Sequence, residues 1–241
     1  MNNLVLVGGA GGIGRSLAKR AANDGWDVIV MDLKNSLERH PPEPGIQSKH
    51  INLTDEGNVI EAFSDLESLA GFVNLAGFMH DLSSIEKTTT VEFDEIINLN
   101  LRGAFIVSKV VLPLLRVHGG AMVNVVSGLA AHVRPNYGAY AASKAGLINL
   151  TKTLALEAAP RVRVNAVAPA AVDTAFLRGG TGRSNEDKPL SLNVEKYIQT
   201  TPLARMASPQ DIVGPIMFLL GPDSKFMTGQ TLWVNGGGYM P

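Results

Sequence analysis

The feature that most constrains this chain is a short apolar run that breaks directly into glycines. Leu4–Val7 is continuously apolar, as in a strand buried on both faces, and Gly8–Gly14 (Gly-Gly-Ala-Gly-Gly-Ile-Gly) follows at once. Apolar residues then recur at helical spacing until Asn23-Asp24-Gly25, which ends the predicted helix. Because glycines let backbone N–H groups approach a pyrophosphate at a helix N-terminus, strand, turn and helix together predict a dinucleotide site. The predicted phosphate contacts are Gly8, Gly12, Ile13 and Gly14.

The rest of the chain alternates between predicted strands and helices. Further strands are predicted at residues 27–31, 50–53, 72–75, 121–126, 162–167 and 231–234. Helices are predicted from 54 to about 66, over 93–114, from the region of Tyr140 to about Glu157, and over 209–220. This alternation predicts an α/β fold with a doubly wound parallel sheet, in a single domain over residues 1–241.

Two segments of the chain lack this regular pattern. Residues 33–49 contain Pro41, Pro42, Pro44 and Gly45, which predicts a surface loop without a stable helix. Residues 175–205 mix glycine breaks with apolar side chains such as Phe176 and Leu177. A segment of this kind predicts a lid whose apolar face meets a substrate.

Composition restricts the partners. The 241 residues carry a formal charge of −1, and Lys and Arg form no cluster in the sequence, so nothing attracts nucleic acid or anionic lipid broadly. The lack of cysteine excludes disulfides and thiolate chemistry, and no spacing of Asp, Glu and His resembles a metal site. The N-terminus lacks the basic segment of a signal peptide, and no run of about 20 apolar residues could span a membrane. We therefore expect a cytoplasmic protein with a small-molecule partner, no membrane and no metal.

An acidic residue ends the second predicted strand. The Asp32 carboxylate can accept hydrogen bonds from the adenosine ribose hydroxyls and would repel a 2′-phosphate. It therefore favours NAD over NADP. Lys34 lies nearby, and we interpret it as a solvated loop charge.

A tyrosine and a lysine one helical turn apart suggest acid–base chemistry. Tyr140 and Lys144 project from the same helix face, so an ammonium can lie close to a phenol. A nearby positive charge would lower the phenol pKa from about 10 and let the tyrosine exchange a proton at neutral pH. Ser127 ends the fifth predicted strand, and ligands of open α/β sheets bind beyond the carboxyl ends of strands. With a hydride carrier, these groups could interconvert an alcohol and a carbonyl.

An asparagine lies on a predicted apolar helix face. Asn100 falls on the buried stripe of the helix predicted over 93–114. Because a buried amide must find hydrogen-bond partners, Asn100 either stabilises the fold or belongs to a site.

These motifs together resemble those of the short-chain dehydrogenase/reductase family, and the resemblance covers essentially the whole chain. The matching motifs, in chain order, are Gly8-x-x-x-Gly12-x-Gly14, Asn74-x-Ala76-Gly77, Asn100 in Asn-Leu-Arg-Gly, Ser127, Tyr140-x-x-x-Lys144, the Pro169 turn, and Thr228-Gly229-Gln230 with Asn235-Gly236-Gly237. The resemblance implies that Tyr140 is the general acid/base and that Ser127 orients and polarises the carbonyl. It further implies that Lys144 lowers the tyrosine pKa and binds the nicotinamide ribose, and that Asn100 holds a water that relays protons.

The resemblance also implies a strand order of 3-2-1-4-5-6-7, further ligand contacts and an oligomer. Cofactor contacts are implied at Asn52, Leu53, Asn74, Ala76, Gly77, Tyr140, Lys144, Pro169, Val172 and Thr174. Substrate contacts are expected at Ser127, Leu129, Tyr140, Ala170, Phe176 and Leu177, with Val133 and Tyr197 as further candidates. This mostly apolar set favours a hydrophobic or alicyclic alcohol. A homotetramer (or homodimer) is implied, with the helices centred on Asn100 and Leu147 at an interface.

Two alternatives accompany this interpretation. Tyr137 and Lys144 have the Tyr-x6-Lys spacing of enoyl reductases, which reduce a C=C bond. A chain that kept the fold and lost turnover would instead be a non-catalytic NAD-binding regulatory protein. Phe78 and His80 follow Gly77 and are further candidates for the substrate pocket.

Overall fold

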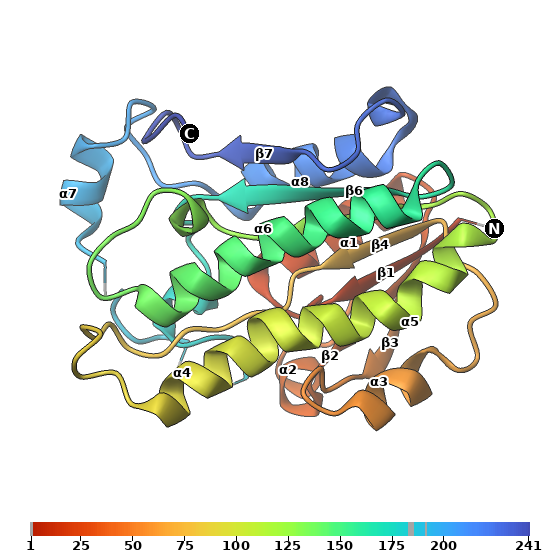
Figure 1. Ribbon diagram of the computed structural model, residues 1–241, viewed down its shortest axis with the longest axis horizontal. Helices are drawn as coiled ribbons and strands as arrows, with labels where there is room; N and C mark the ends of the chain where they lie inside the picture. The colour runs from red at the N-terminus through yellow and green to blue at the C-terminus, as the bar shows by residue number, and fades with distance from the viewer. Residues whose placement is uncertain (1, 183–185, 191) are drawn as a thin grey trace.

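Seven parallel strands form the centre of the molecule (Figure 1). The structure, a computed structural model, describes residues 2–182, 186–190 and 192–241. The sheet order is β3-β2-β1-β4-β5-β6-β7, which confirms the predicted doubly wound sheet in one domain. The strands are β1 Asn3–Val7, β2 Asp27–Asp32, β3 Gln47–His50, β4 Gly71–Asn74, β5 Ala121–Val125, β6 Arg163–Pro169 and β7 Thr231–Val234.

Helices cover both faces of the sheet (Figure 1). The helices α3, α5 and α6 lie on one face, and α1 and α8 lie on the other. The α-helices are α1 Gly12–Asn23, α2 Lys34–Arg39, α3 Glu56–Phe63, α4 Thr90–Ile97, α5 Ala104–Arg116, α6 Gly138–Ala158, α7 Val194–Gln199 and α8 Pro209–Leu220.

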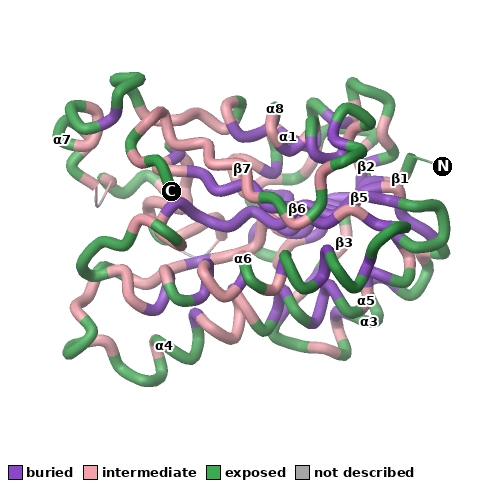
Figure 2. The backbone as a smooth tube through the Cα atoms, turned by 45° about the horizontal axis from the view of Figure 1, so that its top comes forward, coloured by how far each residue is buried: buried purple, intermediate pink, exposed green. Residues whose placement is uncertain are grey.

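The apolar run before the glycine turn contributes side chains to the hydrophobic cores on both faces of the sheet. Within β1, Val5 and Val7 pack against the α5 side, whereas Leu4 and Leu6 pack against α1 and α8. These four side chains are at most 1% exposed. A strand covered on both faces buries every side chain, which explains why the run is continuous and does not alternate. Figure 2 shows this sheet as the buried centre of the molecule.

The third strand lies earlier in the sequence than the apolar pattern predicts. The predicted strand 50–53 is observed as β3, Gln47–His50, which pairs with β2 in the register Ile29↔Gln47. This strand is at the sheet edge, so its polar side chains reach solvent. The apolar Ile51 and Leu53 follow it and are 2% and 3% exposed. The prediction mistook buried residues after the strand for the strand itself.

A short helix occupies part of the segment predicted to lack one. In α2, Lys34–Arg39, the Ser36 side chain is 2% exposed and its hydroxyl donates to the Thr181 carbonyl oxygen at 3.1 Å. The prediction for 33–49 was therefore wrong. A helix of this length is marginal alone, and the contact with residues far along the chain stabilises it.

The long helix predicted over 93–114 contains a π-helical segment. α4 continues through a π-helix at Asn98–Gly103 into α5. By length and composition alone, Thr90–Arg116 could cross a membrane, but half of its most apolar window is buried inside the protein. It packs on the sheet as a core helix, so its hydropathy is no argument for a membrane. Asn100, at the centre of the π-helix, is 1% exposed, as the apolar stripe predicted.

The segment predicted as a lid lies beside the carboxyl ends of the strands (Figure 1). It contains a 3₁₀ turn at Ala175–Arg178 and the helix α7. Residues 183–185 and 191 of the predicted segment lie outside the described residues.

Candidate active site

A cavity at the carboxyl ends of the strands collects most of the residues singled out in the sequence. Nucleotide-site and acid–base residues, far apart along the chain, line the same space. Those lining it are Gly8, Gly12, Ile13, Gly14, Asp32, Leu53, Ala76, Gly77, Ser127, Leu129, Tyr140, Lys144, Pro169, Ala170, Val172, Thr174, Phe176 and Leu177. Asn52, Asn74 and Asn100 are not among the lining residues.

The glycine turn passes so close to neighbouring backbone that side chains are excluded. Gly8 has φ +79°, and a Cβ there would lie 2.7 Å from the Ala76 amide nitrogen. A Cβ on Gly14 would lie 2.5 Å from the Gly9 carbonyl oxygen. The turn therefore presents backbone at the start of α1, which is the geometry that binds a pyrophosphate.

Asp32 is held at the edge of this turn by two backbone amides. Ala10 N donates to Oδ2 at 3.0 Å, and Leu33 N donates to Oδ1 at 2.8 Å. The Arg15 guanidinium donates to the Ala10 carbonyl oxygen at 2.7 Å. The backbone of Ala10 therefore contacts both the Arg15 guanidinium and the Asp32 carboxylate. Asp32 lines the cavity and offers an acceptor for hydroxyls, whereas Arg15 is not among the lining residues.

Tyr140 and Lys144 project from α6 toward the end of β5. The Lys144 Nζ atom lies 5.8 Å from the centre of the Tyr140 ring and donates to the Val125 carbonyl oxygen at 3.0 Å. Tyr140 and Lys144 are 7% and 3% exposed. Burial disfavours the ammonium and lowers the pKa of Lys144 to about 8.

The prediction that Lys144 lowers the tyrosine pKa is wrong for the protein without a ligand. Burial raises the pKa of Tyr140 to about 12, and the Ser127 hydroxyl only partly offsets this effect. Desolvation of the phenolate is therefore the dominant effect on this pKa, and the Lys144 Nζ atom lies over the ring, 5.8 Å from its centre. The predicted proximity of the two side chains is observed, but its electrostatic consequence is not.

Asn100 joins three parts of the site by its amide. Its Nδ2 atom donates to Phe78 O at 2.9 Å and to Ser143 Oγ at 3.1 Å, and its Oδ1 atom accepts from Phe78 N at 3.0 Å. A Cβ on Gly77 would lie 3.1 Å from Lys144 Nζ and 3.4 Å from Asn100 Oδ1. Asn100 therefore stabilises the chain after β4 and also lies near Lys144. Its two interpretations from the sequence, a residue that stabilises the fold and a residue of the site, are compatible.

Known proteins share this arrangement along the whole chain. A family model described as "Enoyl-(Acyl carrier protein) reductase" matches residues 8–239. The 3-oxoacyl-[acyl-carrier-protein] reductase FabG of Staphylococcus epidermidis is 34% identical over 254 residues, covering 100% of both chains. The chain belongs to the short-chain dehydrogenase/reductase family. It is thus an oxidoreductase acting on CH–OH or C=O groups.

Two solved structures of this family have the same fold. A 3-ketoacyl-(acyl-carrier-protein) reductase from Brucella melitensis, complexed with NADH, superposes with a TM-score of 0.88 at 28% identity, covering 99% of this chain and 98% of that chain. The ligand-free aldohexose dehydrogenase of Thermoplasma acidophilum gives a TM-score of 0.87 at 28% identity, covering 100% and 95%. These relatives differ in the substrates that their names state, so fold and family leave the substrate open.

Several residues that were predicted to contact the cofactor or the substrate do not line this cavity. The Asn74 Oδ1 atom accepts from Ala76 N at 3.1 Å, and Asn52 Oδ1 accepts from the Thr54 hydroxyl at 2.8 Å. Both amides therefore stabilise their own turns. Val133 is 75% exposed and is not among the lining residues, whereas Tyr197 is. His80 lies outside this cavity and contacts Glu95 at 2.8 Å.

The C-terminal segment forms a cavity wall that the sequence did not indicate. Tyr239 stacks on His132 with ring centres 5.0 Å apart and meets Trp233 edge-on at 5.8 Å. A Cβ on Gly128, the residue after Ser127, would lie 2.7 Å from the Tyr239 Cζ atom. His132, Arg134, Asn235 and Tyr239 line the cavity. The local signal was the run of glycines before Tyr239. These glycines indicate a turn, but they do not indicate which residues Tyr239 contacts after it.

Proposed function

We propose that this protein transfers a hydride between NAD and a secondary alcohol or ketone, with Tyr140 as general acid/base. The observation that carries the proposal is that Ser127, Tyr140 and Lys144 line the same cavity as the glycine turn and Asp32. The residues fit a dinucleotide, because the turn excludes side chains where phosphates would lie and Asp32 offers an acceptor for ribose hydroxyls.

The proposed chemistry divides among three side chains. Bound NAD would supply the hydride acceptor or donor. In the reducing direction the Tyr140 phenol gives its proton to the carbonyl oxygen, while the Ser127 hydroxyl donates to the same oxygen. In the oxidising direction the Tyr140 phenolate accepts the hydroxyl proton. Donors already placed at the oxygen stabilise the charge that develops there. Lys144 would hold the nicotinamide ribose, and Asn100 a water that relays protons.

NAD is the proposed cofactor, with NADP less favoured. Asp32 supports this choice because its carboxylate would repel a 2′-phosphate. The Brucella melitensis relative, which is complexed with NADH, also supports it. The remaining proposed contacts are Gly8, Gly12, Ile13, Gly14, Leu53, Ala76 and Gly77 on the adenosine and phosphate side, and Pro169, Val172 and Thr174 on the nicotinamide side. For Asn52 and Asn74, only backbone or indirect contributions are proposed.

The proposed substrate has an apolar or alicyclic skeleton. Leu129, Ala170, Phe176 and Leu177 line the cavity and would contact that skeleton. The Phe176 ring lies 5.7 Å from the Tyr140 ring, which puts an apolar surface beside the reacting oxygen. Because Phe176 belongs to the segment 175–205, we propose that this segment acts as a lid.

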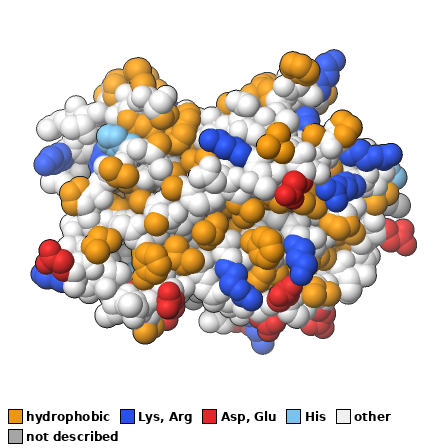
Figure 3. Space-filling view, in the orientation of Figure 1, with side chains coloured by type: hydrophobic (Ala, Val, Ile, Leu, Met, Phe, Trp, Pro, Cys, Tyr) orange, Lys and Arg blue, Asp and Glu red, His pale blue; other side chains and the backbone are white. Residues whose placement is uncertain are grey.

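A cytoplasmic homotetramer (or homodimer) completes the proposal. Phe105 of α5 and Leu156 of α6 are 52% and 81% exposed on the helices expected at the interface. Figure 3 shows this face of the molecule, where apolar side chains lie among Lys, Arg, Asp and Glu. Exposed apolar side chains on a helix pair are typical of surfaces that a second copy covers. Charge-introducing variants Phe105→Glu and Leu156→Glu should lower the mass measured by light scattering.

Enoyl reduction with Tyr137 and Lys144 is the second candidate. The description of the matching family model favours it. Its weakness is geometric, because Tyr137 is the residue before α6 and is only half-buried, whereas Tyr140 interacts with Ser127.

A screen of secondary alcohols, vicinal diols, ketones and enoyl thioesters, each with NAD(H) and NADP(H), tests the proposal. We expect turnover of alcohols or ketones with NAD(H) and its loss in Ser127→Ala. Turnover of enoyl thioesters alone would favour the second candidate. Binding of NADH without turnover of any compound would support a non-catalytic binding protein.

A further inference from the structure

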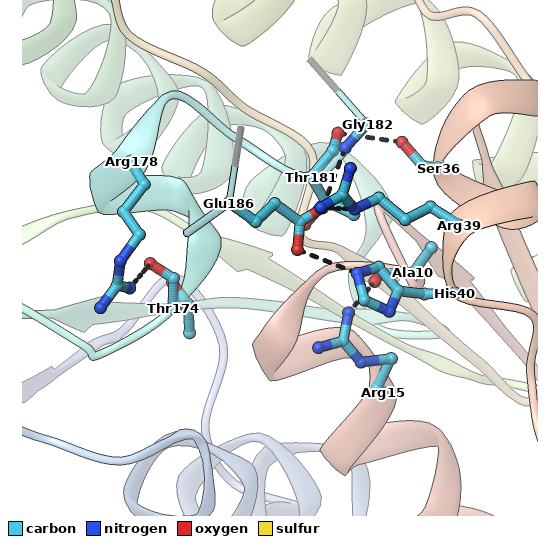
Figure 4. A network of polar contacts seen from close by, with 10 residues as sticks. All are labelled: Ala10, Arg15, Ser36, Arg39, His40, Thr174, Arg178, Thr181, Gly182 and Glu186. Carbon is cyan, nitrogen blue, oxygen red and sulfur yellow. Dashed lines mark hydrogen bonds and ion pairs between the residues drawn. The ribbon is translucent and has the colours of Figure 1, made fainter. Parts of the chain in front are cut away.

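The adenosine end of the cavity is closed by a contact between α2 and the segment after the 3₁₀ turn (Figure 4). The Ser36 hydroxyl of α2 donates to the Thr181 carbonyl oxygen at 3.1 Å. Gly182 has φ +67°, and a Cβ there would lie 2.9 Å from the Ser36 amide nitrogen. Ser36 and Thr181 line the cavity together with Asp32 and Leu33. This contact therefore adjoins the place where the adenosine ribose is proposed to bind.

A single carboxylate contacts both basic side chains of this region. Glu186 lies 3.0 Å from Arg39 Nε and 2.9 Å from His40 Nε2, and it accepts from Gly182 N at 3.3 Å. Its side chain is only 12% exposed. Burial alone would raise the pKa of Glu186, but the His40 ring, the Gly182 amide and the Arg39 guanidinium together hold it below its usual value. Glu186 is therefore an ionised partner of both side chains.

Arg39 and His40 lie on the helix face that borders the cavity. Ser36, Arg39 and His40 occupy positions i, i+3 and i+4, which share one face of a helix. The His40 amide donates to the Ser36 carbonyl oxygen at 2.9 Å, so the helical geometry extends to His40. Ser36 lines the cavity, whereas Arg39 and His40 are outside its lining residues and lie one turn further along the same helix face.

The balance of charge at this end decides between two dinucleotides. A ribose 2′-hydroxyl needs an acceptor such as Asp32, whereas a 2′-phosphate needs cations, and guanidinium groups bind phosphate well. Arg15 and Asp32 both contact the backbone of Ala10, so one guanidinium already lies near this carboxylate. An unpaired Arg39 would supply a second, with His40 as a further donor.

We propose that Glu186 is a specificity-determining residue: by pairing with Arg39 and His40 it withholds them from a 2′-phosphate and reinforces the preference for NAD. This inference rests on the proposed function only in that the adenosine of a nicotinamide dinucleotide binds at Asp32. It assigns cofactor discrimination to two carboxylates from distant parts of the chain.

Binding of two adenosine nucleotides tests the inference without turnover. We would measure adenosine 2′,5′-bisphosphate and adenosine 5′-monophosphate by calorimetry, since they differ only in the 2′-phosphate. Glu186→Gln should raise the affinity for the bisphosphate about tenfold, or about 1.4 kcal/mol, because a freed guanidinium can form a charge-assisted hydrogen bond with the 2′-phosphate. Affinity for the monophosphate should not change. The double variant Glu186→Gln/Arg39→Ala should lose the gain.

Glu38→Gln is the matched control, because Glu38 is an exposed glutamate of the same helix whose partner is Lys34 at 3.9 Å. An equal gain in this control would reveal a general charge effect and overturn the inference. An unchanged ratio of the two affinities in Glu186→Gln, with monophosphate binding intact, would overturn it while leaving the proposed function standing. Failure of the wild-type protein to bind either nucleotide would overturn both.

Discussion

The Nζ atom of Lys144 lies over the Tyr140 ring, 5.8 Å from its centre. Its hydrogen bond goes to the Val125 carbonyl oxygen at 3.0 Å. The Tyr140 pKa is shifted by burial, by the Ser127 hydroxyl and by Tyr137, and Lys144 is not among these causes. It follows that the acid–base behaviour of Tyr140 depends on what else occupies the cavity.

Titration of Tyr140 should reveal this dependence. Because burial raises the pKa of Tyr140 to about 12, the phenol should stay protonated up to about pH 11 in the protein without a ligand. Addition of NAD⁺ should lower this pKa, since its nicotinamide ring carries a positive charge. Near-ultraviolet difference spectra between the wild type and Tyr140→Phe isolate this phenol from the other tyrosines. Ionisation near pH 10 without a ligand would mean that the ammonium outweighs burial, as the sequence alone suggested.

Removal of the Tyr140 hydroxyl should abolish most of the activity. We expect Tyr140→Phe to lower kcat about a hundredfold to ten-thousandfold on the alcohol or ketone found by the screen, because general acid–base catalysis contributes that much. NADH affinity should change little. Tyr137→Phe is the matched control, since Tyr137 lines the same cavity three residues earlier. A larger loss in Tyr137→Phe than in Tyr140→Phe would instead support the enoyl reductase assignment.

The sequence predicted the parts of the site that depend on local chemistry. The glycine turn could be recognised because the run Leu4–Val7 and the glycines are adjacent. Tyr140 and Lys144 could be paired because helical spacing fixes their common face. The doubly wound sheet followed from the alternation of strands and helices.

Features that depend on distant parts of the chain could not be predicted. The helix α2 is stabilised by the contact between Ser36 and Thr181, which the proline-rich composition of its surroundings concealed. The position of β3 depends on its register with β2. The high pKa of Tyr140 follows from burial, which spacing along a helix does not report. Tyr239 contacts the space at Gly128 because β5 and β7 are parallel members of one sheet. Their carboxyl ends therefore lie at the same edge of that sheet.

Lys144 should make the stability of the fold depend on alkaline pH. Burial lowers its pKa from 10.5 to about 8, so between these values the unfolded chain binds more protons than the folded chain. The contribution of Lys144 to the free energy of unfolding therefore rises with pH in this window, and its burial costs most below pH 8. Replacement by methionine should then stabilise the fold by up to about 3 kcal/mol near pH 7, and the gain should shrink towards pH 10.5.

Urea unfolding of the wild type and Lys144→Met at both pH values measures this effect. Lys152→Met is the control, because Lys152 is an exposed lysine of the same helix and should change stability little at either pH. A gain in Lys144→Met that is equal at both pH values would contradict the linkage to this ammonium.

Gly128 should be required because Tyr239 occupies the space that a side chain would fill. Only Tyr239 atoms lie nearest to a Cβ built on Gly128, so Gly128→Ala should displace the tyrosine ring and spare the backbone. The displaced ring would leave His132 and Trp233, so both the KM for the substrate and the tryptophan fluorescence should change.

Tyr239→Ala should have the same two effects, and the double variant should add little to either single one, because both changes remove one contact. Gly214→Ala is the control substitution, since nothing lies within 4 Å of a Cβ built there. Additive effects of Gly128→Ala and Tyr239→Ala on KM would show that the two residues act independently. The C-terminal wall of the cavity would then not depend on Gly128.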